Sequence, residues 1–240
     1  MIMQKEEYMR KMGMYVAEFI GTFTLILVGA GSIIATHTMG AGAAGLIAIA
    51  LAHGLAIACM ASALGAVSGG HFNPAVTFAF FVSKKMNGGR ALCYMVAQLL
   101  GAIGGALVLQ TLFFPQMWEA AQLGTPMLAS NVSFMQGMFI EAILTFFLVM
   151  VIFGTAVDNR APKLGALFIG LTITMDILLG GPLTGAAMNP ARTFGPAFMG
   201  WMAGASYNPW AEHFVYWFGP LAGASFAAWV YKTFLHEPAR

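Results

Sequence analysis

Two short stretches of the chain contain the same three residues in the same order, and they are the first candidates for a functional site. They consist of Asn73, Pro74 and Ala75 in the first half, and of Asn189, Pro190 and Ala191 in the second. Asparagine is a strong helix N-cap and proline is favoured at the first helical position, so each triplet predicts the start of a helix. A helix N-terminus carries about half a positive charge, which favours anions and disfavours cations near it.

The composition places these triplets in a membrane protein. Hydrophobic residues make up 59% of the 240 residues and charged residues only 8%, whereas about a quarter of a soluble domain is charged. The formal net charge of +2 gives no indication of a nucleic-acid partner. No small-residue cleavage site follows the first apolar run, so this run is expected to remain as a membrane span.

Six apolar segments are long enough to cross a hydrocarbon core of about 30 Å as helices. They are 14–36, 44–67, 90–113, 134–157, 164–181 and 213–234. Two further segments, which begin at Asn73 and Asn189, have about ten residues each and would reach only about 15 Å. These two are expected to dip into the membrane without crossing it. The outer loop 115–133 is too irregular to be placed relative to the rest.

The distribution of cationic residues predicts the orientation of the chain. If the six spans alternate, ten of the eleven lysines and arginines fall on one side: Lys5, Arg10, Lys11, Lys84, Lys85, Arg90, Arg160, Lys163, Lys232 and Arg240. The positive-inside rule makes that side cytoplasmic, and both termini with it. Arg192 is the exception, because it lies three residues after Asn189, where the positive end of a helix disfavours a cation. Its position therefore indicates a function.

The chain also contains an internal repeat. The sequence AEFIGTFTLILVG near the N-terminus resembles IEAILTFFLVMVIFG in the second half, with Glu18 matching Glu141. The repeats, about 14–113 and 134–234, each contain three spans and one half-span. Because three is odd, the second repeat must run through the membrane in the opposite direction, as in inverted-repeat transport proteins. The segment 1–240 is thus expected to be one domain in which the two half-helices meet, N-terminus to N-terminus, at the midplane.

The residues before each triplet are expected to form irregular backbone at this depth. Gly69 and Gly70 before the first triplet, and Gly185 before the second, let the chain pass closely through the protein. Irregular backbone within a membrane is tolerated only where it is buried in protein or lines a wet cavity. One such motif would be a weak signal, but two at equivalent places of an inverted repeat predict a path for water.

These features resemble the aquaporin (major intrinsic protein) family over nearly the whole chain. The resemblance is carried by NPAVTF and NPARTFGPA, by the glutamates of the first and fourth spans, and by YWFGPLAGA near the end. It implies an all-α integral membrane fold with six transmembrane helices and two re-entrant half-helices. It also implies a homotetramer in the lipid bilayer with one pore in each subunit.

The resemblance assigns roles to residues around the triplets. Asn73 and Asn189 would direct amide N–H groups into the lumen. Glu18 and Glu141, which are costly inside a membrane, would hold the re-entrant loops by accepting their N–H groups. Carbonyl groups of these loops would form a ladder of acceptors along the pore, and this ladder comprises Gly69, Gly70, His71, Phe72, Gly185, Ala187 and Met188.

The outer selectivity filter of the family can be carried over by its spacing from the triplets. Its members here are His53, Ile177, Ala186 and Arg192. This set resembles the plant tonoplast intrinsic proteins more than the strictly water-selective members, which usually have Phe at the first position and His at the second. Ile177 is expected to make the filter wider and less polar. His53 is the one polar filter residue that could change its charge near neutral pH.

The resemblance also bears on the substrate. Thr193 follows Arg192 where glycerol facilitators carry Asp, and Tyr216 with Trp217 keeps the aromatic pair of the water channels. Water and ammonia are therefore expected to pass. Glycerol is expected to be slow, because His53 and an aromatic ring behind it would leave little apolar wall for the carbon chain.

Several residues have alternative interpretations. His53 could be an ordinary helix histidine bonded to a neighbour, and His71 could brace its loop rather than touch the permeating molecule. Asp176 either lines the outer vestibule or pairs with a backbone donor. Asn131 begins an N-glycosylation sequon in the outer loop.

The sequence favours a passive channel over the other classes considered. A glycerol or urea facilitator is the nearest alternative. A proton-coupled transporter would need an ionisable residue near the midplane, for which Glu18 and Glu141 are the candidates, and a purely structural, junction-forming role would be expected to have bulky filter residues. Cys59 and Cys93 have no metal or redox spacing, and no phosphate loop or nucleophile–base set occurs. No cofactor, metal or enzymatic activity is expected.

Overall fold

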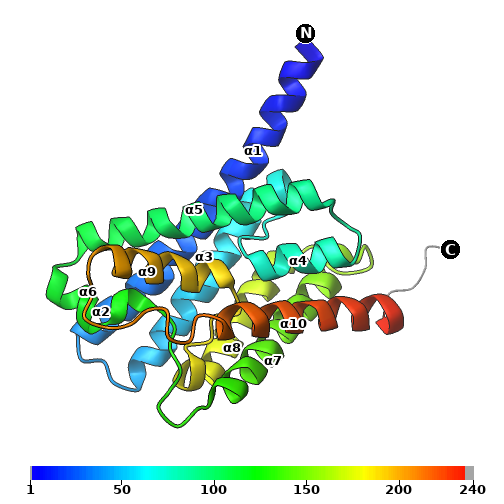
Figure 1. Ribbon diagram of the computed structural model, residues 1–240. Helices are drawn as coiled ribbons and strands as arrows, with labels where there is room; N and C mark the ends of the chain where they lie inside the picture. Colours follow the sequence, from blue (N-terminus) through cyan, green and yellow to red (C-terminus); the bar gives the residue numbers. More distant parts are fainter. Residues whose placement is uncertain (1, 236–240) are drawn as a thin grey trace.

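The computed structural model describes residues 2–235, with side chains from residue 6 onward, and these residues form helices without a strand (Figure 1). Six long helical rods run through the bundle. They are α1 (Ile2–Thr24) continued by η1 (Leu25–Ala30) and α2 (Gly31–Thr38), α3 (Ala44–Ser68), α5 (Gly88–Leu112), α7 (Phe134–Ile152) with η3 (Phe153–Val157), α8 (Gly165–Thr184), and α10 (Val215–Val230) with η4 (Tyr231–Leu235). Of the predicted cytoplasmic cations, Arg240 and the side chain of Lys5 lie outside the described part.

The predicted spans agree with these rods. Five helices of the described residues are each long and apolar enough to cross a membrane. The sixth, α10, has 16 residues and is extended by the five residues of η4. The first helix begins at Ile2 instead of residue 14, because the polar head contains no proline and Glu7 pairs with Lys11 at 2.7 Å, one helical turn apart.

The two predicted half-helices are α4 (Pro74–Val82) and α9 (Pro190–Met202), which have nine and thirteen residues. Each begins directly after its asparagine, whose extended backbone and side-chain oxygen cap the helix: Asn73 Oδ1 accepts from Ala75 N at 2.8 Å, and Asn189 Oδ1 from Ala191 N at 3.0 Å. In Figure 1 the two half-helices lie end to end across the middle of the bundle.

The packing of the helices follows the inverted repeat. In the first repeat α1 packs against α5, and in the second α7 packs against α10. The equivalent helices α3 and α8 pack against each other, and each half-helix packs against the last span of the other repeat, α4 on α10 and α9 on α5. The two repeats are therefore interlocked around a pseudo-twofold axis, and the predicted fold class is confirmed.

Small residues allow the close crossing of α3 and α8. A Cβ atom added to Gly54 would lie 2.5 Å from the carbonyl oxygen of Gly170, and one added to Gly170 would lie 2.7 Å from the Cβ of Ala58. Glycine at both positions lets the backbones approach, which is the usual way in which membrane helices pack tightly.

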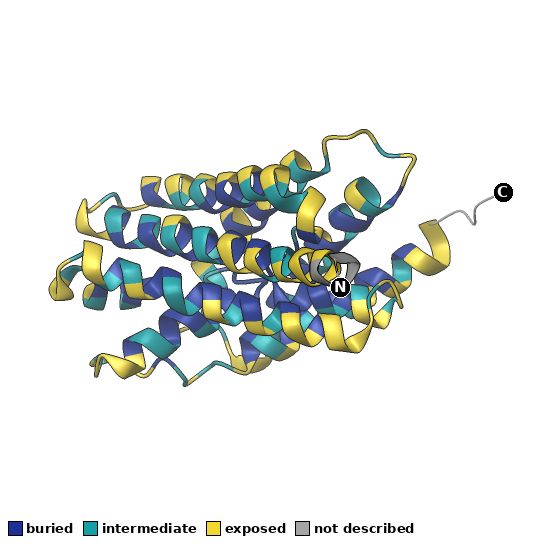
Figure 2. Ribbon diagram, turned by 90° about the horizontal axis from the view of Figure 1, so that it is seen from above, coloured by how far each residue is buried: buried dark blue, intermediate teal, exposed yellow. Residues whose placement is uncertain are grey.

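The outer surface of the bundle is apolar. Along each helix buried and exposed residues alternate with the helical period (Figure 2). On α3, for example, Ile47, Leu51 and Leu55 follow each other one turn apart and expose 44–58% of their surface. An exposed apolar stripe of this kind on every rod matches a bilayer rather than water, so the chain is an integral membrane protein.

The outer loop, for which the sequence predicted no position, is ordered by specific contacts. It contains the short helices α6 (Pro115–Ala120) and η2 (Gln122–Gly124). Beyond them Ala129 N donates to Leu183 O at 2.9 Å, and Leu128 N donates to Glu212 Oε2 at 3.0 Å. The loop thus lies against the end of α8 and the segment before α10.

Candidate functional site

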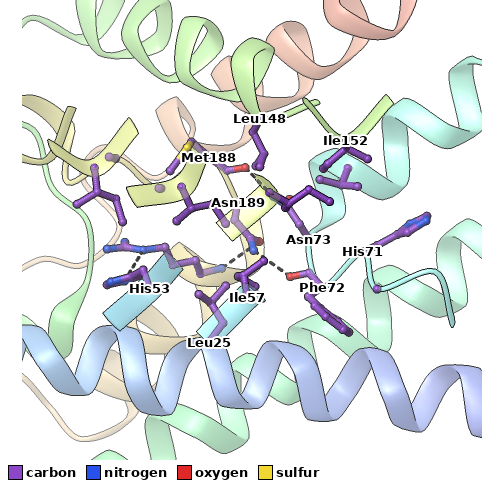
Figure 3. A pocket seen from close by; sticks show the side chains of 18 residues that line it. Leu25, His53, Ile57, His71, Phe72, Asn73, Leu148, Ile152, Met188 and Asn189 are labelled. Carbon is purple, nitrogen blue, oxygen red and sulfur yellow. Dashed lines mark hydrogen bonds between the residues drawn. The ribbon is translucent and has the colours of Figure 1, made fainter. Parts of the chain in front are cut away.

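A narrow cavity lies where the two half-helices meet. Eighteen residues from both repeats line it, and Figure 3 shows His53 and His71 at its opposite ends with Asn73 and Asn189 between them. The cavity offers about 30 Å³ to the centres of water-sized molecules. A single water needs about 10–15 Å³ measured in this way, so the cavity accommodates small molecules in single file.

The two asparagines are hydrogen-bonded across the pseudo-twofold axis. Asn73 Nδ2 donates to Met188 O at 2.8 Å, and Asn189 Nδ2 donates to Phe72 O at 2.9 Å (Figure 3). Each amide nitrogen carries two hydrogens, so one N–H of each asparagine remains for a molecule in the cavity. The sequence predicted the lumen-facing N–H groups but not this reciprocal pair of bonds, which ties the repeats together.

Glu18 holds the first re-entrant loop. Its Oε1 accepts from Ser68 Oγ at 2.6 Å and from His71 N at 3.0 Å, and its Oε2 accepts from Phe72 N at 2.7 Å. The side-chain amide of Gln98 donates to Oε2 at 2.7 Å. A fully buried carboxylate is thereby surrounded by four donors, which compensates for its removal from water.

Glu141 holds the second loop in the same way. Its Oε1 accepts from Thr184 Oγ1 at 2.6 Å and from Ala187 N at 2.9 Å, and its Oε2 accepts from Met188 N at 2.7 Å. These contacts repeat those of Glu18 almost atom for atom, although the residues that make them differ. The internal repeat therefore sets where the hydrogen-bond donors around each glutamate lie. Different residues can occupy these places as long as each of them provides a donor.

The sequence analysis did not predict that two tyrosines and two hydroxyl residues belong to this network. Tyr94 OH donates to Ser68 O at 2.7 Å, and Tyr216 OH donates to Thr184 O at 2.8 Å. The signal was present, because Ser68 and Thr184 both precede the glycine that opens a re-entrant loop, and both tyrosines lie in the third span of their repeat. Extending the comparison of the two repeats to their third spans would have found them.

The loops adopt a backbone conformation that needs such support. Phe72 and Met188, at equivalent positions, have positive φ values of 49° and 52°, and Ala186 has a φ of 43°. Non-glycine residues in this region cost of order 1–3 kcal/mol each and persist only when their surroundings hold them. The glycines Gly69 and Gly185, with φ values of 95° and 76°, end α3 and α8 at the left-handed position that glycine tolerates best.

Most residues of the predicted carbonyl ladder lie at the cavity. Those that line it are Gly70, His71, Phe72, Ala187 and Met188, whereas Gly69 and Gly185 lie just before it as helix caps. The carbonyls of Phe72 and Met188 already accept a bond from an asparagine. A carbonyl oxygen has two lone pairs, so a second bond to a permeating molecule is compatible with the first.

The four predicted filter residues all line this cavity, and two of them, His53 and Arg192, are hydrogen-bonded. Arg192 Nε donates to His53 Nε2 at 3.3 Å, and His53 Nδ1 lies 2.8 Å from Ile49 O. A guanidinium can only donate and a carbonyl can only accept, so His53 carries its proton on Nδ1 and is uncharged. This geometry disfavours the change of charge that the sequence allowed for His53, because a proton on Nε2 would break its bond to Arg192.

The surroundings of His53 also differ from the expectation. None of the ring contacts among the described residues includes His53. Instead the ring lies against Gly29 of the π-helical segment η1, where an added Cβ would come within 2.6 Å of Nε2. Because Gly29 has no side chain, there is room for the histidine ring at this place. The aromatic ring that was predicted behind His53 is therefore not found among the described residues.

One end of the cavity carries His53 and Arg192, whereas the opposite end combines His71 with apolar residues such as Ile152 (Figure 3). Arg192 is 3% exposed, and its Nη1 atom has no hydrogen-bond partner in the protein, which leaves a buried donor for a permeating molecule. At the positions of the other repeat that correspond to His53 and Arg192, the cavity is lined by Ile169 and Val76. Ile177, on the same wall as the filter, adds no hydrogen bond. The internal repeat sets the positions of these four residues. The polar character of one end of the cavity arises because the two repeats differ in sequence at these positions.

His71 braces its own loop. Its Nδ1 lies 3.0 Å from Thr77 Oγ1, and its ring packs on Phe80 with centroids 4.3 Å apart and on Tyr94 at 5.4 Å. The residue nevertheless lines the inner end of the cavity (Figure 3). Both interpretations of the sequence therefore apply, since the ring braces the loop and also borders the path.

Asp176 is 1% exposed and does not line the cavity, and no hydrogen bond reaches its Oδ2. Neither sequence interpretation, a vestibule residue or a carboxylate with a backbone donor, describes that oxygen. Cys59 and Cys93 are exposed on the outer faces of α3 and α5. Asn131 lies in the loop before α7, where it is exposed.

The two buried carboxyl groups Glu141 and Asp176 are expected to respond oppositely to amide substitution. Glu141→Gln weakens three bonds, and hydrogen bonds to charged groups contribute about 1.5–3 kcal/mol each, so the melting temperature should fall. Asp176→Asn removes the cost of keeping a carboxylate with an unpartnered oxygen away from water, so the melting temperature should stay or rise. Thermal unfolding in detergent tests this, and an equal loss in both variants would contradict it.

The fold and the cavity together define an α-helical membrane channel built as an inverted repeat. Two half-helices meet at a narrow cavity that has the buried donor of Arg192 at one end and His71 among apolar side chains at the other. The family model described as Major intrinsic protein matches residues 4–231, and the chain belongs to this family.

The relatives agree with this assignment. The protein named Probable aquaporin TIP3-2 of Arabidopsis thaliana is 44% identical over 200 residues, 77% of this chain and 72% of that protein. Aquaporin TIP4-4 of Zea mays is 41% identical over 191 residues, 76% of this chain and 73% of that protein. The expected likeness to plant tonoplast intrinsic proteins is thereby confirmed. These relatives are channels and not enzymes.

A solved structure extends the comparison to nearly the whole fold. The X-ray structure of the aquaglyceroporin from Plasmodium falciparum matches with a TM-score of 0.84 at 27% sequence identity, and the match covers 94% of this chain and 97% of that chain. Together these comparisons make the chain an aquaporin-family channel, which is consistent with the passive passage of small solutes.

Proposed function

We propose that this chain is a passive channel that conducts water readily and ammonia measurably, passes glycerol slowly, and excludes protons and ions. The observation that carries the proposal is the outer filter. There Arg192 Nη1 is buried without a protein partner, and Ile177 occupies the place where a second ring would narrow the opening. The filter thus offers hydrogen-bond donors to a small polar molecule. Its apolar wall at Ile177 requires no further hydrogen bond from that molecule.

Exclusion of ions follows from the charges around the cavity. The N-termini of α4 and α9 face it, and each contributes about half a positive charge. Arg192 adds a full charge at the outer end. The spare N–H groups of Asn73 and Asn189 donate to a water oxygen and orient it, which opposes proton transfer along the file.

A proton-coupled transporter is less well supported. Such a mechanism needs a carboxyl group that gains and loses a proton during transport. Glu18 and Glu141 each accept several hydrogen bonds from their re-entrant loops. Protonation would place a hydrogen on an oxygen that already accepts at least one of these bonds, and it would remove the charge that strengthens the others. Their arrangement supports a fixed structural role.

A glycerol or urea facilitator is the second candidate. It is favoured by one observation, which is that Gly29 and not an aromatic ring covers the face of His53. Against it stand the small volume of the cavity and Thr193, which follows Arg192 where the resembling facilitators carry Asp. We therefore rank glycerol below water and ammonia.

We further propose that both termini are cytoplasmic and that four subunits assemble, each with its own pore. The orientation is supported by the loops, since those on the side opposite the termini carry Glu119 and Glu212 but no lysine or arginine. The tetramer is supported by the family resemblance and by the apolar stripes on the outer faces of the rods.

Flux measurements on proteoliposomes test the proposed selectivity. We expect water and ammonia fluxes well above those of empty vesicles, linear in the gradient and independent of a proton gradient, with glycerol slower than ammonia. Ile177→Trp, which fills the outer cavity, serves as the blocked control. Glycerol flux above ammonia flux would favour the facilitator, and flux driven by a proton gradient would favour the transporter.

A further inference from the structure

A second cavity lies away from the pore, at the end of the bundle that carries the basic loops. It is formed where the end of α4 meets η3 and η4, and its walls are Ser83, Lys85, Phe153, Val157, Tyr231 and Lys232. It offers about 160 Å³ to the centres of water-sized molecules, against about 30 Å³ in the pore cavity. The space therefore suits a group much larger than a water.

This basic pocket combines an apolar floor with a cationic rim. Phe153 is 1% exposed and forms the floor together with Val157 and the ring of Tyr231. Lys85 and Lys232 come from chain segments far apart in the sequence and are both exposed at the rim. An apolar floor beneath two ammonium groups is the arrangement expected for an amphipathic anion.

The backbone after α4 places Lys85 at this rim. Lys84 has a positive φ of 63°, which is uncommon for a residue with a side chain, and the turn closes when Lys85 N donates to Phe80 O at 2.9 Å. Ser83 Oγ donates to Phe80 O at 3.2 Å, so its hydroxyl is already used. The positive character of the pocket therefore comes from the two lysines.

No carboxylate of the described residues forms an ion pair with either lysine. Asp158 follows the floor residue Val157 directly, but it is engaged elsewhere. Arg160 Nε donates to its Oδ1 at 2.9 Å, and Tyr231 OH donates to its Oδ2 at 2.6 Å. The hydrogen bonds from Arg160, followed by that from Tyr231, hold the pKa of Asp158 well below its usual range. The charges of Lys85 and Lys232 are thus left without a protein counter-ion among these residues.

The level of the pocket in the membrane indicates what fills it. The fourth and sixth spans end in η3 and η4, so the pocket lies where a bilayer has its headgroups. Lys84, Arg90 and Lys163 lie on the same side. In the orientation proposed above, this end faces the cytoplasm. Anionic lipids are concentrated in the cytoplasmic leaflet, and basic pockets between membrane helices bind their headgroups.

We propose that this basic pocket binds the phosphate-bearing headgroup of an anionic membrane lipid. Lys85 and Lys232 contact the phosphate, and the glycerol and upper acyl carbons cover Phe153 and Val157. The inference goes beyond solute conduction, since no residue of the pocket lines the pore cavity. It joins the end of the first half-helix to the ends of two spans from the second repeat, so the bound lipid stabilises the contact between the repeats.

Lipid titration of the delipidated full-length protein tests the proposal. Dioleoyl phosphatidylglycerol, dioleoyl phosphatidylcholine and inorganic phosphate are compared by thermal unfolding and native mass spectrometry. Two lysines at an anionic surface correspond to an affinity factor of about thirtyfold, so Lys85→Gln with Lys232→Gln should lose at least about tenfold for phosphatidylglycerol. The matched control, Lys84→Gln with Lys163→Gln, removes the same charge outside the pocket and should lose less than about threefold.

A variant that keeps the charge separates the pocket from general attraction. Val157→Phe fills the floor and should also abolish the preference for phosphatidylglycerol over phosphatidylcholine. Unchanged water flux shows that each variant is folded. Equal losses in the two double variants, full binding by Val157→Phe, or stabilisation by inorganic phosphate equal to that by the lipid would each overturn the proposal.

Discussion

Substitution of Asn73 or Asn189 by aspartate is expected to disrupt the channel. In the structure each amide nitrogen donates to a carbonyl of the other repeat at 2.8–2.9 Å. A carboxylate cannot donate, so the substitution replaces an attraction by the repulsion of two oxygens and leaves a buried group unsatisfied, at a cost of about 1–3 kcal/mol. It also offsets the positive ends of α4 and α9. We expect loss of assembled protein and, in what assembles, leak of cations.

The chain contains a matched control for this substitution. Asn208 also precedes a proline, but it lies in an outer turn, where its Oδ1 accepts from Trp210 N at 3.1 Å. Aspartate at this position can accept the same bond, so Asn208→Asp should leave yield, water flux and ion exclusion unchanged. Yield, water flux and cation conductance are measured for all three variants. If Asn73→Asp and Asn189→Asp behave like Asn208→Asp, the paired half-helices do not form the pore.

The fold could be predicted because its signals are local and occur twice. An asparagine followed by a proline starts a helix wherever it occurs, and the length of an apolar run decides whether it crosses the membrane. Glu18 and Glu141 were found because a charged residue within an apolar span is energetically costly and therefore indicates a specific role. Because each signal occurs twice, the chain could be divided into two repeats with three spans and one half-span each. The odd number of spans then predicts an inverted repeat in which α4 and α9 meet.

The contacts that complete the site were harder to predict because they join residues far apart in the chain. Ser68 and Tyr94 carry a sequence signal only when the two repeats are compared, and the fold shows that both lie beside the first re-entrant loop. The outer loop was left without a position because its bonds go to the distant residues Leu183 and Glu212.

At the filter, too, a contact between residues far apart in the chain was not predicted. The expected aromatic ring behind His53 is absent among the described ring contacts, because the π-helical turn of η1 brings Gly29 to that place. A π-helical turn shifts the register of a helix by one residue, and hydrophobic periodicity does not reveal it. The filter residues can still be located by their spacing from the triplets, because this spacing does not depend on η1. The residues packed behind them cannot be predicted in this way.

Ile177→His is expected to lower ammonia flux about tenfold, an effect of about 1.4 kcal/mol on the barrier, while water flux is kept. Ile177 is 2% exposed and lines the same cavity as His53 and Arg192. A second imidazole there narrows the opening and adds a polar group that water satisfies with both donors and acceptors. Ammonia has one lone pair and gains less from the new group, so the barrier rises selectively.

The control for this prediction is Ile177→Leu, which preserves the size and the apolar character of the side chain. It should keep the wild-type ratio of ammonia to water flux, and stopped-flow measurements on the same vesicles give both fluxes. The structure makes the comparison sharp, because Arg192 Nη1 has no partner in the protein and its donor stays available to the permeating molecule in each variant. If ammonia flux is the same in Ile177→His and Ile177→Leu, the residue at this position does not set the width of the filter, and the proposed difference from strictly water-selective channels is wrong.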